Sequence, residues 1–71
     1  MRIRIVVISP LGTFRSKFNE YTELELVNTK SALYTNDTLT HLSLIDEIGQ
    51  TVIFRGQIIE NSIIILEEEN G

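Results

Sequence analysis

The last third of the chain, residues 51–69, is the feature that most restricts the fold. It contains two runs rich in β-branched residues, Thr51–Ile59 and Ser62–Leu66, which meet at Glu60 and Asn61. Isoleucine is stiff at χ1 and packs well on a pleated sheet, and asparagine tolerates the positive φ of a tight turn. The segment therefore predicts a closing β-hairpin in a β-rich scaffold.

The rest of the chain shows similar short extended segments separated by turn residues, such as the turns Ser9–Gly12 and Asp46–Gln50. A helix over residues 13–18 is an alternative, because two aromatic residues there are four positions apart. The pattern predicts one all-β domain over residues 1–71, a small β-sandwich or flattened barrel of about seven short, mostly antiparallel strands. The expected strands are Arg2–Ser9, Thr13–Phe18, Tyr21–Val27, Ala32–Tyr34, Thr38–Ile45, Thr51–Ile59 and Ser62–Leu66.

Both faces of the first and last strands are apolar. Ile3, Ile5 and Val7 share one face of the first strand, and Val6 and Ile8 make its other face apolar too, so we expect cover on both sides. A domain of this size buries only about 60% of its unfolded surface. The chain has no cysteine for a stabilising disulfide. Its composition therefore predicts a protein partner or a second copy on an exposed apolar face.

Charge is distributed unevenly along the chain. The net charge is −4, and residues 1–35 carry five basic and three acidic groups, whereas residues 36–71 carry one and seven. We expect Arg2 and Arg4 to face Glu67–Glu69 across paired terminal strands. The acidic balance disfavours nonspecific binding to nucleic acid.

Residue types that carry catalysis are sparse. His41 lies in an expected strand beside Ser43, but nothing marks a third orienting group or an oxyanion site. Asp46 and Glu47 are adjacent in an expected turn, where water solvates them. Neighbouring carboxylates in Glu67–Glu69 point to opposite faces of a strand. The sequence therefore predicts no catalytic residue, no metal, no cofactor and no small-molecule substrate.

Two further features bear on contacts. Gly56 interrupts an apolar strand, which predicts a bend or a close approach by another chain. A nucleic-acid-binding small barrel is a weaker alternative, with Phe14, Phe18 and Tyr34 as stacking candidates beside a basic patch. The candidate basic residues are Arg2, Arg4, Arg15, Lys17, Lys30 and Arg55.

The chain has no apolar stretch of the roughly 18 residues that a membrane-spanning helix needs. Its first residues do not resemble a signal peptide, because Arg2 and Arg4 interrupt them and no small-residue cleavage site follows. We therefore expect a cytoplasmic protein that meets a membrane only through its partners.

Read end to end, the sequence resembles the N-terminal β-sandwich domain of the epsilon subunit of rotary F-type ATP synthases. Residues 5–14 look like the family's first strand, its Pro-x-Gly turn and the aromatic residue that follows. Residues 23–31 are similar to its next strand and polar loop, and residues 32–42 to its Asn-containing loop region. Residues 54–67 look like its closing hairpin. Arg55, Thr35 and Asp37 depart from the family pattern, and no segment resembles its C-terminal helical hairpin.

The resemblance implies a noncatalytic subunit that grips a gamma-like central stalk with one sheet face and reaches a membrane ring with its loops. Asn28, Lys30 and Ser31 would then lie in the ring-side loop, and Gly56 is the further candidate for contact with a partner. The main alternative is a self-assembling structural or accessory protein of the phage type, which would associate with copies of itself.

Overall fold

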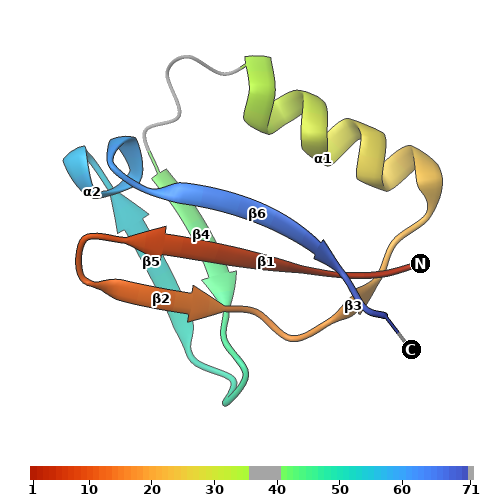
Figure 1. The fold of residues 1–71 in the computed structure, drawn as a ribbon, viewed down its shortest axis with the longest axis horizontal. Helices are drawn as coiled ribbons and strands as arrows, with labels where there is room; N and C mark the ends of the chain where they lie inside the picture. The colour runs from red at the N-terminus through yellow and green to blue at the C-terminus, as the bar shows by residue number, and fades with distance from the viewer. Residues whose placement is uncertain (36–40, 71) are drawn as a thin grey trace.

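Two antiparallel β-sheets lie one over the other in the computed structural model, which describes residues 1–35 and 41–70 (Figure 1). The molecule is flattened, with extents of 33 × 29 × 17 Å. The predicted class, a small all-β fold of mostly antiparallel strands, is confirmed, and two helices are added to it. In chain order the elements are β1 (Arg2–Ser9), β2 (Gly12–Arg15), β3 (Asn19–Glu20), α1 (Glu23–Thr35), β4 (His41–Ile45), β5 (Thr51–Arg55), α2 (Gln57–Glu60) and β6 (Ile63–Glu68).

Strand β1 is the centre of the main sheet. Strand β6 pairs with one of its edges, and β2 and β3 share the other. The predicted turn after β1 is confirmed: the Ser9 hydroxyl donates to the carbonyl of Gly12 (2.8 Å) and accepts from the Leu11 N–H (3.2 Å). Gly12 has a φ of 136°, which suits a residue without Cβ.

Strand β2 is shorter than predicted, and the alternative helix over residues 13–18 is wrong. The strand ends at Arg15, and Ser16 leaves it to form an isolated bridge with Asp46 of the second sheet. Ser16 is buried, and its hydroxyl accepts from the Ile5 N–H and donates to the Lys17 carbonyl, both at 2.9 Å. The hydrogen bond from Ile5 fixes Ser16 against β1, and the bridge to Asp46 links this point to the second sheet.

Strands β4 and β5 form the second sheet, a hairpin with one face on the main sheet. Leu42 pairs with Phe54, and Leu44 pairs with Val52 on this inner face. The predicted turn between the strands is confirmed, because the Asp46 carboxylate accepts hydrogen bonds from the N–H groups of Ile48 and Gln50. The predicted strand Thr38–Ile45 is found from residue 41 onwards, and residues 38–40 lie outside the described residues.

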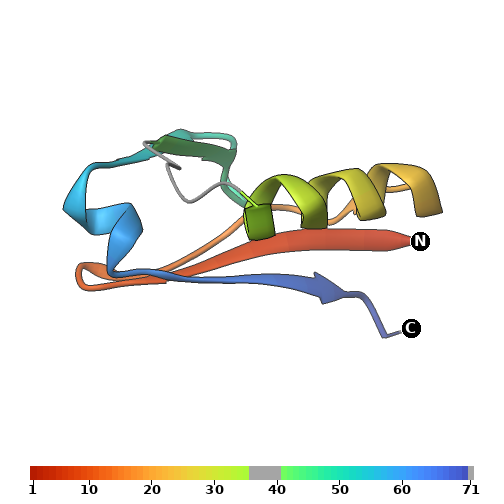
Figure 2. The same ribbon diagram turned by 90° about the horizontal axis from the view of Figure 1, so that it is seen from above.

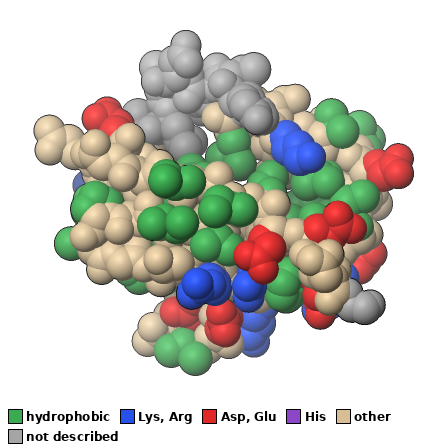
Figure 3. Space-filling view, viewed as in Figure 1, with side chains coloured by type: hydrophobic (Ala, Val, Ile, Leu, Met, Phe, Trp, Pro, Cys, Tyr) green, Lys and Arg blue, Asp and Glu red, His purple; other side chains and the backbone are tan. Residues whose placement is uncertain are grey.

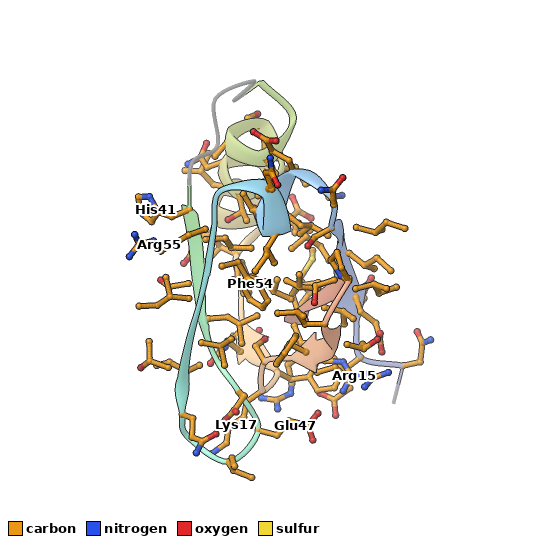
Figure 4. All side chains as sticks on the ribbon, turned by 90° about the vertical axis from the view of Figure 1, so that its left-hand side faces the viewer. Arg15, Lys17, His41, Glu47, Phe54 and Arg55 are labelled. Atoms are coloured by element: carbon orange, nitrogen blue, oxygen red, sulfur yellow. The ribbon has the colours of Figure 1, made fainter. Side chains whose placement is uncertain are left out.

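The core lies between the hairpin and the main sheet. Its buried members are Val7, Leu44, Phe54 and Ile59, and Val7 is completely inaccessible to solvent. Phe14 of the main sheet meets Phe54 edge to face, with ring centroids 5.2 Å apart. Figure 4 shows Phe54 between the two layers.

Helix α1 replaces two predicted strands, Tyr21–Val27 and Ala32–Tyr34, and this part of the prediction is wrong. The helix begins with a capping box. The Thr22 hydroxyl accepts from the Glu25 N–H, and the Glu25 carboxylate accepts from the Thr22 N–H, both at 3.1 Å. Acidic side chains in the first turn also interact favourably with the helix dipole. The local signals for helix outweigh the alternation of Glu and Leu.

The predicted closing hairpin at Glu60 and Asn61 is also wrong. Strand β5 ends at Arg55, and Gly56 turns the chain with φ 58° and ψ −135° into α2. The chain then passes to the main sheet, where β6 pairs with β1 rather than with β5. The prediction that Gly56 marks a bend is confirmed, and α2 contributes Ile59 to the core.

The terminal strands are joined by the predicted ion pairs. In the β1–β6 ladder, Arg2 binds Glu69, and Arg4 Nη2 lies 2.7 Å from Glu67 Oε1. The N-terminal ammonium binds Glu20 Oε1 of β3 at 2.9 Å. These contacts are exposed or only partly buried, so they favour the correct register more than they stabilise the fold.

Two neighbouring residues on β5 provide a direct test of the core. Phe54→Ala should lower the free energy of unfolding by about 3–5 kcal/mol, because it leaves a cavity between the sheets. Ile53→Ala, on the exposed face, should cost about 1 kcal/mol or less. Urea unfolding followed by circular dichroism measures both. Equal losses would contradict the assignment of inner and outer faces.

The ion pair at Glu20 predicts a pH dependence. The hydrogen bond and charge of the N-terminal ammonium lower the pKa of Glu20 below its usual 4.5. Its contribution to stability is therefore present above that pH and is lost as the pH falls through the lower pKa of the folded state. Glu20→Gln should be slightly less stable than the parent chain near neutral pH, and the difference should vanish in acid. Acetylation of the N-terminus should have the same effect as this substitution.

Candidate interaction surfaces

The predicted contact residues do not form one site. Asn28, Lys30 and Ser31 are exposed, but they lie within α1, so the expectation of a loop there is wrong. Lys30 lines a groove beside β6. Gly56 lines a separate, shallow hollow with His41 and is not part of that groove.

The candidate acids and bases are occupied by structural contacts or lie on the surface. His41 is exposed at the start of β4, opposite Arg55, and Figure 4 shows both side chains on the outside of the hairpin. Asp46 holds the β4–β5 turn, and Glu67 and Glu69 bind arginines. Within residues 1–35 and 41–70, no group of three or more histidine, aspartate or glutamate side chains is placed to hold a metal ion.

Arg4 is the centre of a charged cluster on the main sheet. Its guanidinium lies 4.6 Å from the centre of the Phe18 ring, binds Glu67, and lies 4.0 Å from Glu47 of the hairpin turn. Its Nε is buried and has no hydrogen-bond partner among the described residues. The cluster joins β1 to three other segments, but the unpaired donor offsets part of its stabilisation.

The aromatic residues considered for base stacking have intramolecular roles. Phe14 packs against Phe54 in the core, and Phe18 lies under Arg4. Tyr34 lies outside the residues whose side chains the structure describes. Stacking bases on either phenylalanine would require breaking these contacts, so the described residues provide no ready platform for nucleic acid.

An apolar patch lies on the face of the main sheet that points away from the hairpin. Residues paired across antiparallel strands share a face, so the pairs Ile8–Ile63 and Val6–Ile65 lie side by side. Ile63 is 61% exposed, and Ile8 and Ile65 are each 40% exposed. Figure 3 shows hydrophobic side chains gathered over β6 and β1, with charged groups below them. We call the exposed residues Ile8, Ile63 and Ile65 the open face; Val6 lies on the same side of the sheet but is only 4% exposed.

The pairs that flank the open face are polar or charged. Arg4 pairs with Glu67 beyond one end of the patch, and Arg15 pairs with Val6 from the neighbouring strand β2. The prediction that both faces of the first strand are covered is correct for the inner face and for Val6 on the outer face, but it is wrong for Ile8, which is 40% exposed. An apolar centre with a polar rim is typical of a surface that binds another protein.

A groove of about 530 Å³ separates α1 from β6. Its walls are formed by Lys30 and Leu33 of α1 and by residues of β6 and the turn before it: Ser62, Ile64, Ile65 and Leu66. Figures 1 and 2 show α1 running alongside β6, beyond the edge of that strand. The helix leaves Leu24 and Val27 largely exposed, so it covers the sheet loosely.

No protein-family model, curated protein or solved structure matches this chain. The resemblance to the epsilon subunit therefore stays a prediction, and the helical conformation of residues 23–31 removes the expected strand and loop from it. Among the described residues, no helix combines the length and the apolar character needed to cross a membrane.

Substitutions at Arg4 test whether its charged cluster makes a net contribution to the stability of the fold. Arg4→Met keeps an apolar stem against Phe18 and removes the unpaired buried donor, so we expect a change in unfolding free energy within about 1 kcal/mol. Arg4→Ala removes the stem as well and should destabilise the fold more. Urea unfolding at low and high salt measures both. A large loss for Arg4→Met that disappears at high salt would contradict this expectation.

Proposed function

We propose that this chain is a noncatalytic subunit that docks on a larger protein through the open face. The supporting observation is the cluster of exposed isoleucines at Ile8, Ile63 and Ile65, held in register by the β1–β6 ladder. Isolated exposed apolar residues are ordinary, but a contiguous patch on a rigid sheet favours a binding role.

The size of the patch limits what it can do alone. Burying the exposed parts of the three isoleucines would contribute roughly 3 kcal/mol. Association costs about 4 kcal/mol or more in lost translational and rotational freedom. The open face therefore supports docking within an assembly that supplies further contacts, rather than a tight complex by itself.

The sequence resemblance suggests a specific assembly, a rotary F-type ATPase in which the chain contacts a gamma-like stalk. In that case the protein works in the cytoplasm at the surface of a membrane complex. Self-association is the alternative, because an apolar sheet face can also meet the same face of a second copy.

A matched pair of substitutions tests the open face. Ile63 and Ile53 are 61% and 60% exposed and lie on strands of different sheets, facing away from the core. Ile63→Gln should weaken binding about tenfold, because it removes an apolar contact from the centre of the interface. Ile53→Gln should leave binding unchanged. Tagged parent and variant chains are used to capture partners from the native source, and the same partner is quantified for each.

The recovered partner decides the identity of the assembly. If the parent chain captures ATPase alpha, beta and gamma subunits and Ile63→Gln does not, the result would support a subunit of a rotary ATPase. A defined homo-oligomer that dissociates in Ile63→Gln would favour self-assembly instead. Equal recovery by the parent chain and both variants would overturn the role of the open face.

A further inference from the structure

We propose that the groove between α1 and β6 binds an extended segment of a partner protein, which adds to the main sheet as a strand beside β6. The segment would present apolar side chains alternately and carry a carboxylate that meets Lys30. This inference concerns the edge of the sheet and does not depend on the open face.

The backbone of β6 provides the first argument. The Glu69 N–H donates to the Arg2 carbonyl at 3.0 Å, so residue 69 points its backbone groups toward β1. In an antiparallel ladder this direction alternates, so Ile63 and Ile65 also point toward β1, whereas Ile64 and Leu66 point outward. Among the described residues, β6 pairs with no other strand. Its outer N–H and C=O groups are therefore available to a further strand.

The groove lies along this edge of β6 and includes both outward-pointing residues, Ile64 and Leu66. Ser62, Ile64, Ile65 and Leu66 line one side of it, and Lys30 and Leu33 of α1 line the other. An exposed strand edge as apolar as Ile63–Leu66 invites pairing, and proteins usually protect such edges with charge, proline or a covering element. Here the helix stands beside the edge and leaves a groove. Because α1 covers the edge of β6 only in part, the groove leaves room for one added strand.

The charges of the groove restrict the chemistry of its occupant. Lys30 makes no ion pair among the described residues, and it is the only Lys or Arg between Lys17 and Arg55 in the sequence. Glu68, which continues the outward-pointing series of β6, would repel a second acidic group at the far end of the strand. One carboxylate beside Lys30 and apolar residues elsewhere satisfy both conditions.

A second copy of the chain fits this groove less well than a single strand. Pairing two β6 strands around a twofold axis would bring their α1 helices to the same side of the joined sheet. Each helix already runs alongside its own β6, beyond the strand edge (Figure 1). The two helices would therefore compete for the space that an isolated strand could occupy.

Amide hydrogen exchange tests the open edge in the unbound chain. The amides of Ile64 and Leu66 should exchange at least about tenfold faster than those of Ile63 and Ile65, which bond to β1. Slow exchange of Ile64 and Leu66 that becomes faster on dilution would show that a second copy covers the edge, and it would overturn the proposal.

A synthetic peptide tests the site itself. The probe is about six residues long, alternates valine and threonine, and ends in aspartate, so that it spans the outward-pointing part of β6. Adding it should slow exchange at Ile64 and Leu66, with no change at Ile63. A peptide N-methylated at alternate residues on its bonding side should fail to do so, because it lacks the donors for a ladder.

Charge variants complete the test. Lys30→Glu should weaken peptide binding roughly fivefold or more, and Lys30→Arg should preserve it. Both variants should keep the parent circular dichroism spectrum, because the residue is exposed on α1. Ile63→Gln should bind the peptide normally, which separates this site from the open face. No protection by the peptide, or protection that is insensitive to Lys30→Glu, would overturn the proposal.

Discussion

The main sheet depends on hydrogen bonds to β1, because β6 pairs with one edge of this strand and β2 and β3 pair with the other. Each contact joins β1 to a different part of the chain. Val7 lies near the middle of this arrangement and is completely buried, so the ladder and the core reinforce each other at one residue. Loss of the β1–β6 pairing would detach β6 from the main sheet. It would also remove part of the surface against which the hairpin packs.

The same arrangement determines which surfaces are left for function. One hairpin covers the inner face of the sheet, and residues 1–35 and 41–70 form no equivalent layer over the outer face. Helix α1 lies alongside β6, and a groove separates the two elements. The open face and the groove are therefore apolar surfaces that the described elements leave uncovered, and a partner that covers them would stabilise both.

The sequence predicts those features that depend on neighbouring residues. Alternation in β1 correctly separates Ile3 and Val7 from Arg4, and the turn at Ser9–Gly12 follows from its proline and glycine. The alternation of Glu and Leu at the start of α1 favours a strand, whereas the Thr22–Glu25 capping box is the local signal for a helix. The pairing of β6 with β1 cannot be predicted from neighbouring residues, since it joins segments near the two ends of the sequence.

These outcomes also explain why the candidate sites were only partly predicted. Residue type identified Lys30, but its position beside β6 required the helix and the long-range strand pairing together. Strand β6 then gives each of its residues a separate role. Ile64 and Leu66 face the inner side and turn their backbone groups toward the groove, whereas Ile63 and Ile65 face the open side and bond to β1. Because these roles alternate along a single strand, substitutions one residue apart can distinguish a contact at the open face from a contact at the edge.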